Sequence, residues 1–109
     1  MITVETLFSG SSGNCTLIRT ERTAVLVDAG KNCKAVLSSL DLLGLSLSDL
    51  SAVFVTHEHR DHISALDVMM RKQPIPIHVT SLSAPELCRG RSGAENAGIH
   101  AGLLYEVQV

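Results

Sequence analysis

Aromatic residues are scarce in this sequence, at 3% of 109 residues, and tryptophan is absent. The hydrophobic fraction is nevertheless 45%, so leucine, valine, isoleucine and alanine must supply the buried surface. A net charge of only −2 beside that much apolar surface excludes a disordered chain. We therefore expect residues 1–109 to form one globular domain with a layered, aliphatic core.

Other absences limit the surroundings and the partners of the protein. The three cysteines, Cys15, Cys33 and Cys88, lack C-x-x-C spacing, which argues against a disulfide framework and against a thiolate zinc site. No apolar run approaches the roughly 20 residues of a membrane span, and the first residues do not resemble a signal peptide. Nine basic residues against eleven acidic ones predict no basic surface for nucleic acid. We expect a cytoplasmic protein with no membrane partner.

The first part of the chain predicts a small antiparallel sheet followed by a helix. Alternating polar and apolar residues between turn-rich segments predict strands at residues 2–8, 15–19 and 24–27, joined as an antiparallel meander. The spacing then becomes helical over residues 32–43, and Gly44 suits a left-handed helix end. The apolar face of this helix consists of Val36, Leu37, Leu40 and Leu43.

The rest of the chain alternates strands with helices. A continuous apolar run at residues 52–56 predicts a strand buried on both faces, followed by a helix over 64–72 and a strand over 75–80. A helix start at 83–86, a glycine-rich loop at 90–102 and a last strand at 103–109 complete the prediction. These helices can cover only one face of their sheet, so the fold class is α+β, with a layered mixed sheet whose other face needs a partner.

Three of the five histidines fall within six residues at the end of the predicted strand 52–56, in the segment His57-Glu58-His59-Arg60-Asp61-His62. Residues two apart in an extended segment point the same way, so His57 and His59 can direct their imidazoles at one cation. Asp61 and His62 follow where the chain turns toward a helix, which moves their side chains to a second position nearby. The alternative interpretation is a solvated polar loop.

This set of donors suits a pair of metal ions. Imidazole with carboxylate favours Zn²⁺, and the same mixture also accepts Mn²⁺ or iron. Two such ions roughly 3.5–4 Å apart would lower the pKa of a bridging water and polarise a carbonyl or phosphoryl oxygen. The segment therefore predicts a hydrolase site.

The segment also resembles the signature of the metallo-β-lactamase superfamily, which is H-x-H-x-D-H after a hydrophobic strand, preceded by a strand that ends in an aspartate, here Asp28. The resemblance implies an αββα sandwich of which this chain supplies about one half, the N-terminal one. By that match His57 and His59 would bind the first metal ion. Asp61 and His62 would bind the second, and Asp61 would also orient the attacking water.

Two further features gain a role from this resemblance. Asp28 would orient a ligand histidine by accepting its second ring proton, and its alternative is a turn residue at the end of a strand. Residues 9–15, together with 53–59, are similar to the YycJ-type branch of the superfamily, which is associated with DNA exonuclease activity. The loop that contains Ser11, Ser12 and Asn14 could present hydroxyl and backbone N–H groups to an anionic substrate, or it could be a plain turn.

The resemblance covers roughly residues 1–85 and implies three further metal ligands that cannot be assigned in this chain. His78 and His100 qualify by residue type alone, and each is better interpreted as structural or exposed. Four ligands over two ions leave each ion with two, fewer than the three usual for a catalytic zinc. Because family members are about twice this length, the chain is either an N-terminal part of a longer protein or a short form that pairs with itself.

Three functional hypotheses follow. The first is a binuclear metal-dependent hydrolase that cleaves a phosphodiester such as DNA. The second is a thioester or lactone hydrolase of the same superfamily, which would need an apolar pocket. The third is a catalytically silent or self-associating module with an incomplete metal site.

Overall fold

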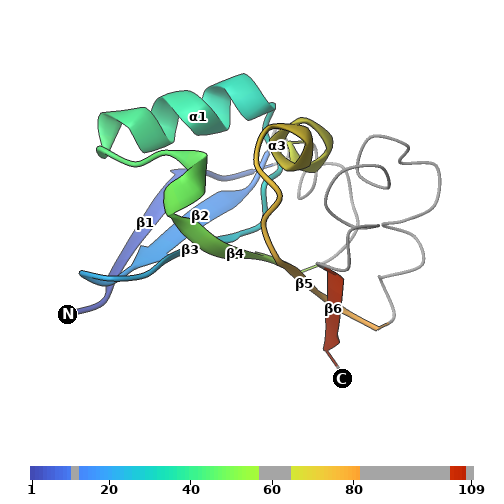
Figure 1. The fold of residues 1–109 in the computed structure, drawn as a ribbon. Coiled ribbons are helices and arrows are strands. Elements are labelled where there is room, and N and C mark those ends of the chain that lie inside the picture. The colour runs from blue at the N-terminus through green and yellow to red at the C-terminus, as the bar shows by residue number, and fades with distance from the viewer. Residues whose placement is uncertain (11–12, 57–64, 82–103, 108–109) are drawn as a thin grey trace.

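The computed structural model describes residues 1–10, 13–56, 65–81 and 104–107, and the other residues are drawn as a grey trace in Figure 1. The described part contains one six-stranded sheet, accompanied by two α-helices and a short 3₁₀ helix. The strands are β1 (Thr3–Phe8), β2 (Cys15–Arg19), β3 (Ala24–Val27), β4 (Leu50–Val55), β5 (Ile77–Thr80) and β6 (Leu104–Val107). The helices are α1 (Cys33–Leu42), η1 (Leu47–Asp49) and α3 (Leu66–Lys72).

The strands lie in the sheet in the same order as in the sequence. β1, β2 and β3 are antiparallel, which confirms the predicted meander. β4, β5 and β6 are then added parallel to β3, with α1 between β3 and β4 and α3 between β4 and β5. Because parallel strands end at the same edge of a sheet, the carboxyl ends of β3 to β6 lie together.

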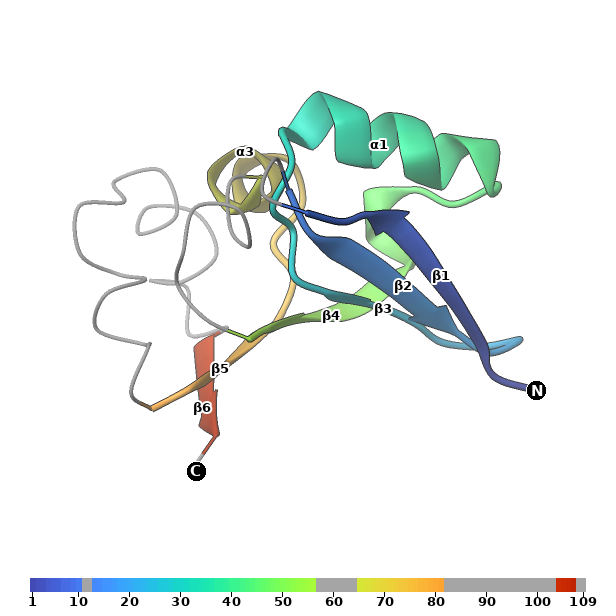
Figure 2. The same cartoon turned by 180° about the vertical axis from the view of Figure 1, so that it is seen from behind.

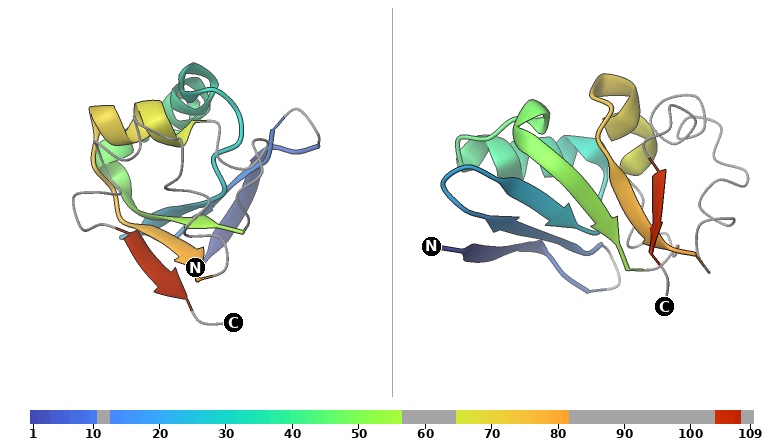
Figure 3. Two further views of the ribbon diagram at one scale, coloured as in Figure 1. Left: turned by 90° about the vertical axis from the view of Figure 1, so that its right-hand side faces the viewer. Right: turned by 60° about the horizontal axis from the view of Figure 1, so that its bottom comes forward.

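Both α-helices lie on the same face of the sheet, as the views in Figures 1 and 2 and the end-on view in the left panel of Figure 3 show. The core lies between that face and the helices. Its fully buried side chains are aliphatic or methionine and come from strands, from helices and from the approach to β5: Leu17, Leu26, Leu40, Leu66, Met69, Met70, Ile75, Ile77, Val36, Val53 and Val79. This confirms the α+β layered sheet with its helices on one face. No helix of the described residues is long and apolar enough to span a membrane.

Helix α1 begins and ends within one residue of its prediction. At its start, the side chain of Asn32 accepts a hydrogen bond from the backbone N–H of Ala35, at 2.8 Å. At its end, Gly44 has φ +77°, and the N–H groups of Gly44 and Leu45 donate to the carbonyls of Asp41 and Leu40. This pair of hydrogen bonds is a Schellman motif, which explains why a glycine with positive φ stands at the end of the helix.

Two strand predictions need correction. The strand predicted from residue 75 begins at Ile77, because Pro74 and Pro76 have no N–H to give to a ladder. The strand predicted for residues 52–56 runs from Leu50 to Val55, and it is not buried on both faces. Its Phe54 is 39% exposed on the face away from the helices. The segments predicted at 83–86 and 90–102 lie outside the described residues, as does residue 64.

The second face of the sheet points away from α1 and α3 and is called the open face below. It carries a row of side chains without Asp, Glu, Lys or Arg. The strand register aligns one residue from each strand in this row: Thr6, Thr16, Val27, Phe54, His78 and Tyr105. The His78 ring stacks between the rings of Phe54 and Tyr105. Its centroid lies 4.8 Å from the centroid of Phe54 and 5.0 Å from that of Tyr105. His78 therefore has a structural contact on this face, as the sequence predicted.

Candidate metal centre

The predicted metal motif begins at the carboxyl end of β4, beside the carboxyl end of β3. The last described residue before it is Thr56, and the residue that follows β3 is Asp28. The predicted ligands His57, His59, Asp61 and His62 lie outside the described residues, as do Ser11 and Ser12. Their roles stay predictions, and the structure shows how the segments around them are held.

Asp28 is attached to the residue that leads into the motif. Its carboxylate accepts two hydrogen bonds from Thr56, one from the backbone N–H to Oδ1 and one from the hydroxyl to Oδ2, each at 2.8 Å. Its own N–H donates to the carbonyl of Phe54 at 2.7 Å. Asp28 is 4% exposed and is the one non-glycine among the described residues with a positive φ, of 66°. This backbone conformation costs about 1–2 kcal/mol for most residues, so the bonds to β4 must stabilise it.

The two residues after Asp28 hold two more segments at the same edge. The carbonyl of Ala29 accepts a hydrogen bond from the N–H of Ala65, at 2.8 Å. The N–H of Gly30 donates to the carbonyl of Asn14, at 2.9 Å. Residues 28–30, called the anchor segment below, therefore bind the residue before the motif, the residue after position 64 and the loop between β1 and β2. Both flanks of residues 57–64 are fixed to one stretch of backbone.

The loop between β1 and β2 is closed by the side chain of Asn14. The amide Nδ2 donates to the carbonyl of Gly10 at 2.9 Å, and Oδ1 accepts from the N–H of Gly10 at 3.3 Å. Gly13 has φ +156°, and a Cβ at this position would lie 3.1 Å from the backbone nitrogen of Lys31. Through these contacts Asn14 acts as a turn residue. The contact of this loop with a substrate stays a prediction.

Lys31 brings a positive charge to this edge of the sheet. Lys31 follows the anchor segment, and its Nζ lies 5.2 Å from the ring centroid of Phe8, the last residue of β1. A cation over an aromatic face is held at a defined position while its ammonium stays available to an anion.

Cys15 is the buried titratable group nearest to this arrangement. Burial raises the pKa of its thiol to about 12, and the charge of Asp28 acts in the same direction. The thiol is therefore protonated at neutral pH and is neither a nucleophile nor a thiolate ligand. Cys15 and Cys33 are both free and buried, and they pack in the core as small apolar residues.

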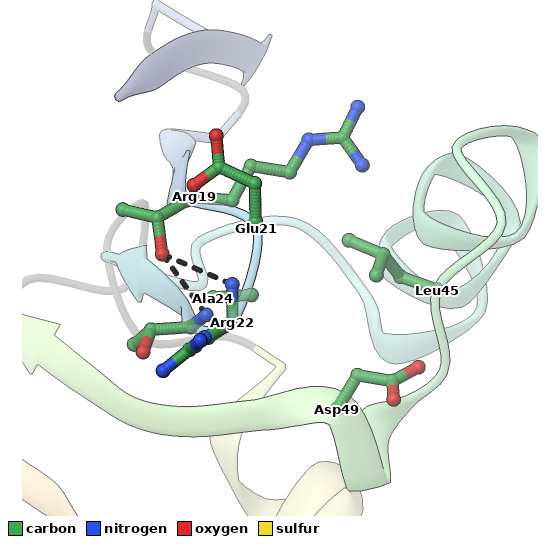
Figure 4. A pocket seen from close by; sticks show the side chains of 8 residues that line it. Arg19, Glu21, Arg22, Ala24, Leu45 and Asp49 are labelled. Carbon is green, nitrogen blue, oxygen red and sulfur yellow. Dashed lines mark hydrogen bonds between the residues drawn. The ribbon is translucent and has the colours of Figure 1, made fainter. Parts of the chain in front are cut away.

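A pocket also lies at the end of the sheet opposite to the anchor segment. It has a volume of about 240 Å³ and lies against the turn between β2 and β3, with Leu45 and Asp49 on its other side (Figure 4). The Thr20 hydroxyl in its wall accepts hydrogen bonds from the N–H groups of Arg22 and Thr23, so it stabilises the turn. Within the described ranges no group of three or more His, Cys, Asp or Glu side chains could hold a metal ion. The candidate centre stays the edge beside Thr56, the residue that leads into the predicted motif.

Comparison with known proteins identifies the family of the chain. The family model for the metallo-β-lactamase superfamily matches residues 9–102. The chain belongs to the metallo-β-lactamase superfamily. Its match includes the loop between β1 and β2, the anchor segment and the histidine motif.

Two relatives within this superfamily confirm the resemblance to its YycJ-type branch. The chain is 42% identical over 72 residues to exodeoxyribonuclease YycJ of Bacillus anthracis, and 40% identical over 72 residues to exodeoxyribonuclease WalJ of Streptococcus pneumoniae. Each match covers 66% of this chain and 27% of the relative. The matched part is thus about a quarter of the length of these relatives.

Solved structures show the same fold. A metallo-β-lactamase of Cronobacter sakazakii aligns with 80% of this chain at a TM-score of 0.65 and 19% identity, over 33% of its own length. The chemotaxis sensor ODP, solved as a peroxy diiron species, aligns with 98% of this chain at a TM-score of 0.72 and 16% identity, over 41% of its own length. The chain is therefore a partial metallo-β-lactamase fold.

The donor chemistry of the motif fits a metal pair of the kind that the superfamily implies. The four predicted ligands are three imidazoles and the carboxylate of Asp61, which offer borderline nitrogen donors and a hard oxygen donor, the mixture that zinc, manganese and iron accept. The anchor segment holds Thr56, the residue directly before this set in the sequence.

Sequence reasoning named Asp28 but missed Thr56. A signal was present, because Thr56 directly follows β4 and Asp28 directly follows β3, the strand parallel to it. The residues that follow two neighbouring parallel strands lie side by side, so this pair could have been predicted from the strand order.

Proposed function

We propose that this chain is the metal-binding part of a metal-dependent hydrolase that cleaves phosphodiester bonds in DNA. The observation that carries the proposal is the attachment of Asp28 to Thr56, because it holds the residue directly before the histidine motif at the edge where the carboxyl ends of the parallel strands meet. The similarity to two exodeoxyribonucleases supports the choice of substrate.

In this proposal His57, His59, Asp61 and His62 hold two ions, with Zn²⁺ as the first choice and Mn²⁺ or iron as alternatives. When bound, such ions lower the pKa of a water and offset the charge of a phosphoryl group. Asp61 would orient the water. Lys31 supplies a positive charge for a phosphate at the same edge, although the chain as a whole has a net charge of −2.

The test uses the purified chain and two histidine variants. Metal content is measured first by mass spectrometry after loading with zinc or manganese. Release of nucleotides from an end-labelled DNA strand is then measured for the chain, for His59→Ala and for His78→Gln, whose histidine lies on the other face of the sheet. We expect His59→Ala to lose bound metal and activity and His78→Gln to keep both. Nucleotide release that is unchanged in His59→Ala would contradict the proposal, and turnover of a thioester or lactone instead would favour the second enzymatic hypothesis.

The open face of the sheet favours a second, structural role, in which two copies of the chain stack these faces. The row through Phe54 and His78 contains no charged residue, and neither does the neighbouring row of Val4, Ile18, Val25 and Ala52. A twofold interface places like against like, so an uncharged face meets no repulsion from its copy. Two stacked sheets, about 10 Å apart, would form a sandwich core. Light scattering tests this proposal, and a stable monomer at low concentration would contradict it.

A further inference from the structure

Thr56 uses both of its hydrogen-bond donors on one carboxylate. Its N–H and its hydroxyl bind different oxygens of Asp28, and both distances are 2.8 Å. Two bonds from the backbone and the side chain of the same residue fix its backbone and its χ1 angle together. The chain therefore enters the motif from a residue whose position relative to β3 is set.

The other flank of the motif ends on the same piece of backbone. The N–H of Ala65 binds the carbonyl of Ala29, the next residue after Asp28. Ala65 is fully buried and precedes α3, whose Met69 and Met70 belong to the core. Thr56 and Ala65, the described residues nearest to the motif on each side, are therefore both held by the anchor segment.

We propose that Thr56 is a positioning residue for the metal motif, and that its hydroxyl bond to Asp28 preorganises residues 57–62 for metal binding. The inference rests on the proposed function. Its physical reason is that a metal site built on a loop must order that loop, and each constraint made in advance removes part of this cost from metal binding. Groups that support metal ligands from outside typically change metal affinity about 10- to 100-fold when removed.

Threonine variants separate the hydroxyl bond from the backbone bond. Thr56→Val keeps the shape and the N–H donor and removes only the hydroxyl, whereas Thr56→Ser keeps both donors. Thr6→Val is the matched control, because Thr6 is an exposed threonine of β1 in the row on the open face. All four proteins are prepared free of metal, and their unfolding midpoints in urea are measured so that affinities are compared between folded proteins.

Zinc chloride is then titrated into each protein by calorimetry, with a chelator of known affinity as competitor. We expect Thr56→Val to bind zinc about tenfold or more weakly than the unchanged chain, and Thr56→Ser and Thr6→Val to bind within about threefold of it. A merely structural role would lower the urea midpoint of Thr56→Val and leave its zinc affinity in the folded state unchanged, and that result would overturn the inference. If the unchanged chain binds neither zinc nor manganese, the proposed metal site is itself wrong. If His59→Ala abolishes binding while Thr56→Val does not weaken it, the site stands and the role of Thr56 is refuted.

Discussion

The substitution Asp28→Asn tests how strongly the carboxyl end of β3 is held to the carboxyl end of β4. Asparagine has the size of aspartate and tolerates the positive φ of this position, so the backbone cost should not change. It removes the charge and replaces one acceptor oxygen by an NH₂ group, which can donate to the Thr56 hydroxyl, so both 2.8 Å bonds become bonds between neutral groups. A hydrogen bond to a charged group contributes about 1.5–3 kcal/mol, and we therefore expect the free energy of unfolding to fall by about 2 kcal/mol.

The measurement is urea unfolding of the metal-free chain, followed by far-ultraviolet circular dichroism because the chain has no tryptophan. Asp28→Ala should cost more than Asp28→Asn, because it removes both bonds and also adds the strain of a positive φ, about 1–2 kcal/mol. Asp41→Asn on the exposed side of α1 is the control and should change stability by less than about 0.5 kcal/mol. A value for Asp28→Asn as small as that of the control would refute the idea that this carboxylate stabilises the edge.

Three other predictions address charge, assembly and titration. Lys31→Gln should weaken binding of a fluorescent DNA strand, as measured by anisotropy at several salt concentrations. It should also lower the steepness of log affinity against log salt concentration by about 0.7–0.9. Lys34→Gln on α1 is the control and should change neither the affinity nor the steepness. Phe54→Lys, which adds a charge to the open face, should turn a dimer into a monomer in light scattering, and Leu42→Lys on the exposed side of α1 should leave the mass unchanged. Because the folded pKa of Cys15 is about 12, above its ordinary value of 9.0, the stability from this buried thiol is present below pH 9 and should be lost as the pH rises toward 12. At pH 8 a thiol reagent should modify Cys15 rapidly only after unfolding in urea, and rapid modification of the native chain would contradict its burial.

The sequence predicted helices and strands well where hydrophobic spacing and end signals agree. Helix α1 has both, with Asn32 at its start and Gly44 at its end, and its bounds were within one residue. The strand before the motif was interpreted as doubly buried because an apolar run does not reveal how many faces of its sheet are covered. Helix η1 was missed, since three residues are too few for a period, although Ser46 and Asp49 carry a start signal in which the Ser46 N–H binds the Asp49 carboxylate.

The candidate site was predicted less completely than the fold. Histidine spacing identified the motif because it lies within six consecutive residues. The anchor segment was only partly visible, since Ala29 and Gly30 act through backbone groups that every residue possesses. Thr56 depends on a contact 28 residues distant in the chain, which requires the parallel pairing of β3 and β4 to be known first.

The order of the strands has a consequence for how the protein is made. Each strand of the sheet lies beside the strand synthesised just before it, so the sheet can grow in the order in which the chain leaves the ribosome. The meander of β1, β2 and β3 can form while the remainder is still unmade. The bond between Asp28 and Thr56 closes only when β4 has been added, and the attachment of Ala65 follows nine residues later. The anchor segment is therefore joined to its neighbours on a scaffold that already exists, before β5 and β6 are made.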